Sequence, residues 1–190
     1  IYREDLNSKQ RVKKKYKSVL FNNTLIKKSV FDKIRFEKQI TKYGHEDTIF
    51  AFNLSKIKAN IKHIDNPVLH GDVDLNIVFF NKTHKSTENL NLIYNTNLID
   101  SDFVTFLKIF KKLQKARLNY FFVIIHKIFY PVFKYNLTSK IPSLYIFELF
   151  RLSYFCNINL KKYMPFFSVR NSAAINAPLA KPLRECAVCF

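Results

Sequence analysis

Glycine is nearly absent from this chain, which has two glycines in 190 residues where average usage would give about thirteen. Tryptophan is missing altogether, and there are only three cysteines. Because three cysteines make no disulfide framework, we expect a reducing compartment. The longest apolar run, residues 118–133, is interrupted by His126 and Lys127, so it is too short and too polar to cross a bilayer comfortably.

Acidic residues are also scarce, with 14 Asp and Glu against 32 Lys and Arg, which gives a formal net charge of +18. Such an excess favours anionic partners, namely nucleic acid, anionic lipid or a phosphorylated substrate. The lysines are spread along an Asn-, Ile- and Phe-rich chain, as an AT-rich genome would also produce, so the charge alone identifies no partner. The length predicts about one domain. The chain begins at Ile1 with polar, basic residues, and we expect it to be a fragment of a longer protein.

Both glycines lie in short polar segments, residues 43–48 and 66–71. In a composition that avoids glycine, each is expected where a side chain cannot be accommodated. Gly44 is followed by a His-Glu-Asp run, and Gly71 follows a histidine. Carboxylates and an imidazole beside a bent backbone indicate a reaction site.

Asp47 has two interpretations. Apolar residues recur at spacings of four, three and four over residues 47–61, which predicts an amphipathic helix, and Asp47 can cap its first turn. Alternatively, Asp47 is a general base held by Gly44 and flanked by the acidic Glu46, suited to take a proton from a sugar hydroxyl. His45 either orients Asp47 or only caps the helix.

His70 also has two interpretations, a structural residue or a metal ligand. A lone histidine is more often structural than a ligand. It lies between Pro67, which ends a strand predicted over residues 62–68, and Gly71, in a loop position where ligands tend to lie. Mixed His and carboxylate sites do bind divalent metals. The Asp-Val-Asp at residues 72–74 imitates a metal-binding D-x-D, but we interpret its first residue as the cap of the next helix.

Helical patterns dominate the rest of the chain. The apolar stripe from Phe103 to Leu118 is most simply part of the core. Its bolder interpretation is a helix lying in a membrane surface with lysines at the headgroups. Helices are predicted within residues 18–40, over 72–99, from 101 to 118, up to Tyr130 before Pro131, and over 142–160.

Several segments resemble one family. Residues 43–48 with Phe50 read Tyr-Gly-His-Glu-Asp-Thr-x-Phe, and residues 66–70 read Asn-Pro-Val-Leu-His. In this order they resemble the "YGHEDT-x-F" and "NPVxH" segments of bacterial family 2 glycosyltransferases. The resemblance covers about residues 18–160. Shorter pieces are similar to the family's "N-x-L-I", "F-D-E-x-I", "K-T … N-L" and C-terminal helical segments: Asn23 to Ile26, Phe36 to Ile40, Lys82-Thr83 with Asn89-Leu90, and Ser143 to Phe155.

The resemblance implies the C-terminal half of a GT-A fold, a mixed α/β sheet, followed by an α-helical extension. Asp47 matches the family's general base, and Glu46 matches the adjacent residue that contacts the acceptor, with Gly44 and His45 beside it. His70 matches a histidine that completes metal or diphosphate binding, and we expect it to converge with Asp47 on a single cleft. A divalent metal, Mg or Mn, would offset the charge of the leaving group.

The implied activity is inverting transfer of a sugar from a nucleotide-sugar donor to a saccharide or lipid-linked acceptor. The implied location is cytoplasmic, with peripheral contact to the inner face of the cytoplasmic membrane and no nucleic acid. We expect residues 1–80 to end the catalytic domain, 81–170 to be the helical extension, and 171–190 to be a disordered or atypical tail. The nucleotide-binding half would lie upstream of residue 1, so this chain alone is expected to be inactive. The alternative is a basic helical module without catalysis that binds a membrane surface or RNA.

Overall fold

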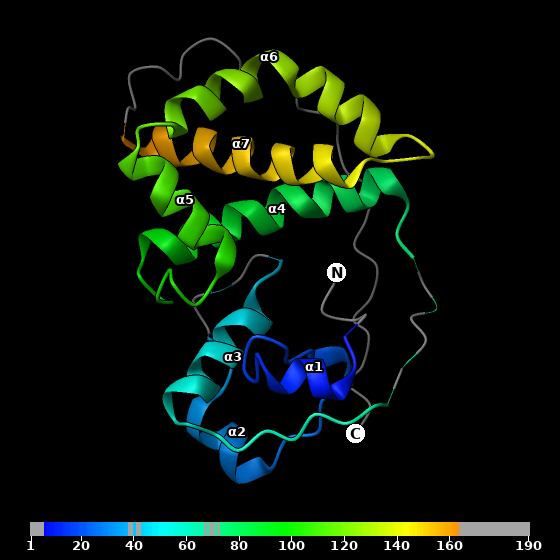
Figure 1. Ribbon diagram of the computed structural model, residues 1–190, viewed down its shortest axis with the longest axis vertical. Coiled ribbons are helices and arrows are strands. Elements are labelled where there is room, and N and C mark those ends of the chain that lie inside the picture. The colour runs from blue at the N-terminus through cyan, green and yellow to red at the C-terminus, as the bar shows by residue number, and fades with distance from the viewer. Residues whose placement is uncertain are drawn as a thin grey trace, which may run out of the picture.

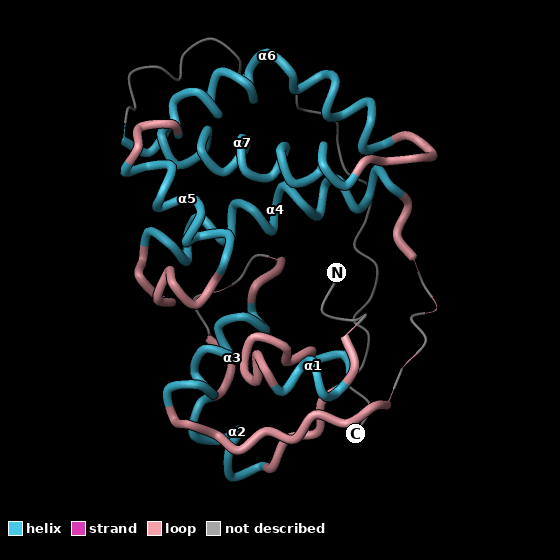
Figure 2. The backbone as a smooth tube through the Cα atoms, in the orientation of Figure 1, coloured by secondary structure: helices cyan, strands magenta, loops and turns pink. Residues whose placement is uncertain are grey.

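In a computed structural model, the described residues are 6–37, 40, 43–66, 68, 71 and 73–163, without the side chains of 161–163. Every regular element in these ranges is a helix (Figures 1 and 2). The expected mixed α/β sheet is therefore wrong for this part of the chain. The elements are α1 (Ser8–Val12), η2 (Phe21–Asn23), α2 (Lys28–Ile34), α3 (Glu46–Lys56), α4 (Asn76–Asn95), α5 (Thr105–Lys115), α6 (Asn119–Thr138) and α7 (Leu144–Tyr163).

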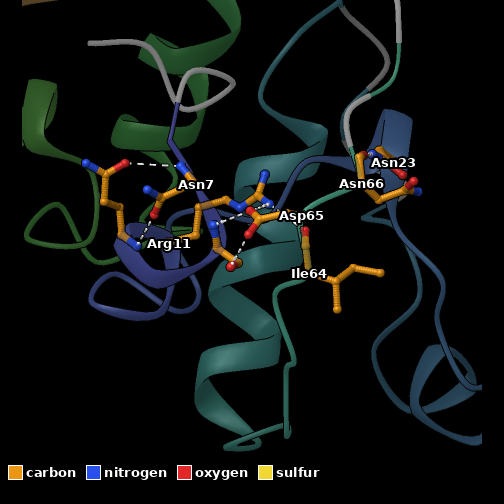
Figure 3. A network of polar contacts seen from close by, with 8 residues as sticks. Asn7, Arg11, Asn23, Ile64, Asp65 and Asn66 are labelled. Carbon is orange, nitrogen blue, oxygen red and sulfur yellow. Dashed lines mark hydrogen bonds and ion pairs between the residues drawn. The ribbon is translucent and has the colours of Figure 1, made fainter.

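The segment expected as a strand runs as a loop over its described residues 62–66, beside the N-terminal part of the chain (Figure 3). Arg11 donates a hydrogen bond to the carbonyl of Ile64 at 2.6 Å, and Asn23 donates to the carbonyl of Asn66 at 2.6 Å. Side chains therefore satisfy backbone carbonyls that a neighbouring strand would pair in a sheet. The strand prediction is therefore wrong for residues 62–66, which form no strand and have no partner strand within the described residues.

Asp65 is the most connected residue of this loop (Figure 3). Its carboxylate accepts hydrogen bonds from the hydroxyl and the backbone N–H of Ser8, both at 2.6 Å, and lies 3.7 Å from the guanidinium of Arg11. The two bonds from Ser8 and, to a lesser degree, the positive charge of Arg11 lower the pKa of Asp65 from its ordinary value. These contacts attach α1 to the loop that follows α3.

The largest packed unit consists of α4, α6 and α7, which lie alongside one another, with α5 against one end (Figure 1). The aromatic content supplies its cores. Phe155 of α7 is fully buried, with its ring centroid 4.7 Å from that of Phe110 and 5.3 Å from that of Phe106, both on α5. A second buried cluster joins α4, α6 and α7 through Phe80, Phe133, Leu137 and Phe150.

The shorter helix α3 attaches to this unit from the opposite side of α4 (Figure 1). Ile49 and Phe52 of α3 form one buried cluster with Ile93 of α4 and with Ile99 in the following loop. The division expected at residue 80 falls inside α4. The tail expected at 171–190 lies outside the described residues.

The helix expected to end before Pro131 continues through it to Thr138 as α6. Proline has no N–H, so one carbonyl in the preceding turn of the helix loses its hydrogen-bond partner. Because Pro131 is exposed, that carbonyl can bind water instead, which reduces the free-energy cost of a proline inside the helix. Beyond it, Phe133 and Leu137 pack against Phe150 and hold the helical continuation. Among the described residues, no helix combines the length and the apolar character that a membrane crossing requires.

His84 of α4 lies in the aromatic interface with α6 and α7. Its ring centroid is 4.5 Å from that of Phe80, 5.0 Å from that of Phe150 and 4.8 Å from that of Tyr154. Burial lowers the pKa of His84 from its ordinary value, against the smaller opposing effects of the Phe80 carbonyl and the Glu88 charge. The folded chain therefore favours the neutral imidazole.

We expect acid to weaken the fold through His84. Because its pKa is lower in the folded chain, the unfolded chain binds more protons below its own value of about 6.5. The stability conferred by the neutral ring is present above that pH and is lost as the pH falls towards the folded pKa, by at most about 1.4 kcal/mol per pH unit. Urea titrations across this range should show a smaller loss for His84→Phe than for the unaltered chain. An equal loss in both would contradict the assignment.

Candidate functional site

Residues 43–48 form a sharp turn that leads into α3. Gly44 has a φ of +96° and His45 a φ of +73°, so two consecutive residues are in the left-handed region. His45 occupies the position before the helix, and its side chain makes no capping hydrogen bond. Asp47 is therefore not the cap that one interpretation assigned to it. Glu46 and Asp47 are the first two residues of the helix.

Gly44 is required by both backbone conformation and space. A Cβ built on it would lie 2.7 Å from Oγ and 2.9 Å from Cβ of Ser86 on α4. The expectation that scarce glycines mark positions closed to side chains is thus confirmed for Gly44. For Gly71 it is wrong, because a Cβ there would meet no atom within 4 Å.

One face of α4 holds the turn at three positions spaced by four and three residues. The ammonium of Lys82 lies 5.5 Å from the centroid of the Tyr43 ring, a cation–π contact. Ser86 closes the space beside Gly44, and the buried amide of Asn89 donates a hydrogen bond to the Gly44 carbonyl. This spacing puts all three side chains on one side of a helix, so α4 fixes the start of α3.

The two carboxylates differ in their surroundings. Glu46 is exposed, whereas Asp47 is half-buried and accepts a hydrogen bond from the hydroxyl of Thr48 at 3.2 Å. Both lie in the first turn of α3, where the helix dipole favours negative charge. A carboxylate held in this position can accept a proton from a hydroxyl that approaches the helix end.

His70, the expected metal ligand, lies outside the described residues, and its convergence with Asp47 stays a prediction. Within the described residues, no three His, Cys, Asp or Glu side chains are grouped so that they could hold a metal ion. Of the Asp-Val-Asp segment, Asp72 also lies outside the described residues, and Asp74 pairs with the ammonium of Lys82 at 2.7 Å. Leu75 is the residue directly before α4, and its side chain makes no capping hydrogen bond.

The described surface contains a pocket of about 650 Å³ next to the C-terminal half of α3. Neither Glu46 nor Asp47 lines it. A helical rise of about 1.5 Å per residue separates Asp47 from Lys56, at the pocket, by about 13 Å along the axis. The pocket is lined by Phe52, Lys56, Tyr94, Asn95, Asn97, Ile99, Asp100, Ser101 and Lys111.

Sequence reasoning did not assign Ser86 or Asn89 to the site. Asn89 carried a signal, because it is a polar residue four positions before Ile93 and so shares the face of α4 that buries Ile93. A buried amide needs a hydrogen-bond partner, so its presence there predicts a contact with another segment. Ser86 carried no such signal, since its role depends only on its closeness to Gly44.

Comparison with known proteins adds no relative: no protein-family model, no curated protein and no solved structure matches the chain. The functional argument therefore rests on the residues and on their arrangement in space.

Proposed function

We propose that this chain carries the acceptor-activating part of an inverting glycosyltransferase, with Asp47 as the general base. The observation that supports the proposal most strongly is contact among the segments that resemble the family. Four pairs of residues from these segments, far apart in sequence, meet in the fold. The pairs are Tyr43 with Lys82, Gly44 with Asn89, Asn23 with Asn66, and Phe36 with Phe50, whose ring centroids lie 5.0 Å apart.

A random coincidence of short motifs would have no reason to bring their members together. Here the glycine that precedes the Glu-Asp pair is packed against Ser86 and bonded to Asn89, so the motif residues determine where the two carboxylates stand. Holding a non-glycine residue such as His45 at positive φ costs free energy, and strain of this kind gathers at functional sites. The same contacts support the assignment of Glu46 and Asp47 as the reactive pair rather than as ordinary helix-end residues.

In the proposed reaction, Asp47 accepts the proton of an acceptor hydroxyl as the hydroxyl oxygen attacks the anomeric carbon of a nucleotide-sugar. A new glycosidic C–O bond forms, the bond from the anomeric carbon to the diphosphate oxygen breaks, and the configuration inverts. The nucleoside diphosphate leaves with the bonding electrons, and the proton stays on Asp47. Glu46, exposed beside it, accepts a hydrogen bond from a second acceptor hydroxyl.

No step is assigned to a divalent ion, because the expected ligand His70 lies outside the described residues, and within them no three His, Cys, Asp or Glu side chains form a group. The proposal also requires no sheet in the described part of the chain. It concerns the acceptor side alone, and a donor-binding surface is a separate requirement of the reaction.

The test is sugar transfer by the whole polypeptide that the gene encodes, assayed with UDP-glucose, UDP-N-acetylglucosamine and GDP-mannose and followed by release of the nucleoside diphosphate. Asp47→Asn is expected to lower turnover by about 10²- to 10⁴-fold while leaving nucleotide-sugar binding unchanged. Asp102→Asn, an exposed carboxylate elsewhere, is the matched control and should retain full turnover. Retained turnover in Asp47→Asn, or no transfer from any donor by the unaltered protein, would overturn the proposal.

A further inference from the structure

The outward side of α6 is a continuous apolar stripe. Its members recur at spacings of three, four, four and three residues, which places them on one face of the helix. The opposite face buries His126, Phe133 and Leu137. The stripe, here called the α6 surface, consists of Phe121 (58% exposed), Ile124 (55%), Ile128 (64%), Val132 (54%) and Tyr135 (81%).

Positive charge lies along one margin of the α6 surface. Lys127 and Lys134 are exposed and lie about 100–120° around the helix from Ile128 at its centre, by the helical rotation of about 100° per residue. The helix contains no acidic residue. The excess of positive charge continues in the sequence on both sides of α6. Residues 103–163 contain eleven Lys and Arg residues and one acidic residue, Glu148.

Apolar side chains at the centre of a helix face and lysines at its margin match the requirements of an anionic lipid surface. The apolar groups enter the boundary between headgroups and acyl chains, and the ammonium groups remain among the phosphates. A helix that lies in the plane of the surface makes both kinds of contact at once.

Two other occupants fit the α6 surface less well. A second copy of the chain would oppose Lys127 and Lys134 with their own counterparts, in molecules that each carry a net charge of +18. Single-stranded RNA stacks its bases on aromatic rings, but the three central residues of the α6 surface, Ile124, Ile128 and Val132, are aliphatic, and its two aromatic members lie at opposite ends.

We propose that α6 docks the protein on the surface of an anionic lipid bilayer through the α6 surface. Helices α6 and α2 lie towards opposite ends of the molecule's longest axis, with α4 and α7 between α6 and the turn at residues 43–48 (Figure 1). Docking through α6 therefore leaves that turn uncovered. The inference does not rest on the transferase proposal, and either can fail without the other.

The absence of tryptophan allows a direct test by fluorescence. Ile128→Trp places a single reporter at the centre of the α6 surface, and Leu25→Trp places one at a fully exposed site far from it. With vesicles of phosphatidylcholine and one third phosphatidylglycerol, Ile128→Trp should shift its emission to shorter wavelength and be quenched by brominated acyl chains. Leu25→Trp should do neither. Equal responses of both reporters, or no response of Ile128→Trp, would overturn the proposal.

Co-sedimentation with the same vesicles separates the apolar and charged contributions. Ile124→Ser with Ile128→Ser should lower the partition coefficient by about tenfold or more, because both side chains lose their transfer free energy. Lys127→Glu with Lys134→Glu should weaken binding comparably at low salt, whereas the same charge change on α2, by Lys28→Glu with Lys33→Glu, should have a much smaller effect. All six sites are exposed, so the fold should survive, which circular dichroism will verify.

Three outcomes would reject lipid as the occupant. The first is unchanged partition of the α6 variants. The second is a concentration-dependent dimer, seen by analytical ultracentrifugation, that Ile124→Ser with Ile128→Ser dissociates. The third is binding to single-stranded poly(U) RNA that depends on the α6 surface and excludes vesicles.

Discussion

Gly44→Ala is expected to destabilise the fold by about 2–4 kcal/mol, a large effect for the addition of one methyl group. A non-glycine residue held at positive φ costs about 1–3 kcal/mol, and Gly44 has a φ of +96°. The new methyl would also lie 2.7 Å from the hydroxyl oxygen of Ser86, and overpacking typically costs about 1–3 kcal/mol. The turn and α4 cannot both keep their places, and we expect them to separate.

Chemical denaturation of the variant and the unaltered chain measures this loss, and Gly71→Ala is the matched control. At Gly71 the new methyl meets no atom within 4 Å and the φ is not positive, so the variant should be neutral or more stable by up to about 1 kcal/mol. If the two alanine variants were equally stable, the structural role of Gly44 would be refuted.

A second substitution separates strain from crowding. Ser86→Gly removes the atoms that the new methyl would strike, so it should recover part of the stability lost in Gly44→Ala, although it costs about 1 kcal/mol by itself in a helix. The positive φ of residue 44 remains, and recovery should be incomplete. A double-mutant cycle with no coupling between the two positions would mean that the close approach is not what requires glycine.

Four helices were predicted well from the sequence, although only α5 has a strong apolar periodicity. Predictions over 47–61, 72–99, 101–118 and 142–160 correspond to α3, α4, α5 and α7, with α3 ending at Lys56 rather than Ile61. Local pattern suffices for α5, which buries Leu107 and Phe110 on one face. In contrast, α3 buries the consecutive residues 49–52, and α4 packs on two sides, so their burial does not follow one stripe. At Pro131 the local rule failed, because packing of residues on both sides of the proline decides the outcome.

The strand prediction failed for a different reason. The apolar pattern of residues 62–68 is a local property, but membership of a sheet requires a partner strand, which the pattern of one segment cannot reveal. In the fold, the side chains of Arg11 and Asn23 take the place of that partner by donating to the carbonyls of Ile64 and Asn66.

The candidate site was predicted in part. The scarcity of glycine pointed correctly to Gly44. A chain that otherwise avoids glycine keeps it where a positive φ requires it, and this local requirement can be recognised from the sequence. The residues that secure it, Ser86 and Asn89, lie more than forty positions away, and only the fold brings them to the turn. Whether Asp47 and His70 share one cleft stays a prediction, since His70 is outside the described residues.

Phe155→Ala should be the most damaging of the aromatic substitutions, with an expected loss of about 3–5 kcal/mol. Phe155 of α7 is fully buried where α7 packs against α5, and its ring contacts those of Phe106 and Phe110 edge to face. Truncation leaves a cavity where α4, α5 and α7 join, because the packed rings around it cannot all collapse inward. Thermal and urea unfolding would measure the loss.

Phe121→Ala is the matched comparison, since it removes the same ring from a site that is 58% exposed. Its stability should stay within about 0.5 kcal/mol of the unaltered chain, because a surface ring has little packing to lose. Vesicle binding should follow the opposite order: Phe121→Ala weakens it, whereas Phe155→Ala, assayed where it is still folded, does not. An aromatic-rich chain would thus use phenylalanine in two separable ways, in the core for cohesion and on the α6 surface for contact with lipid. If Phe121→Ala destabilised the fold as much as Phe155→Ala, the outer ring would belong to the core, and the α6 surface would not be free to bind a bilayer.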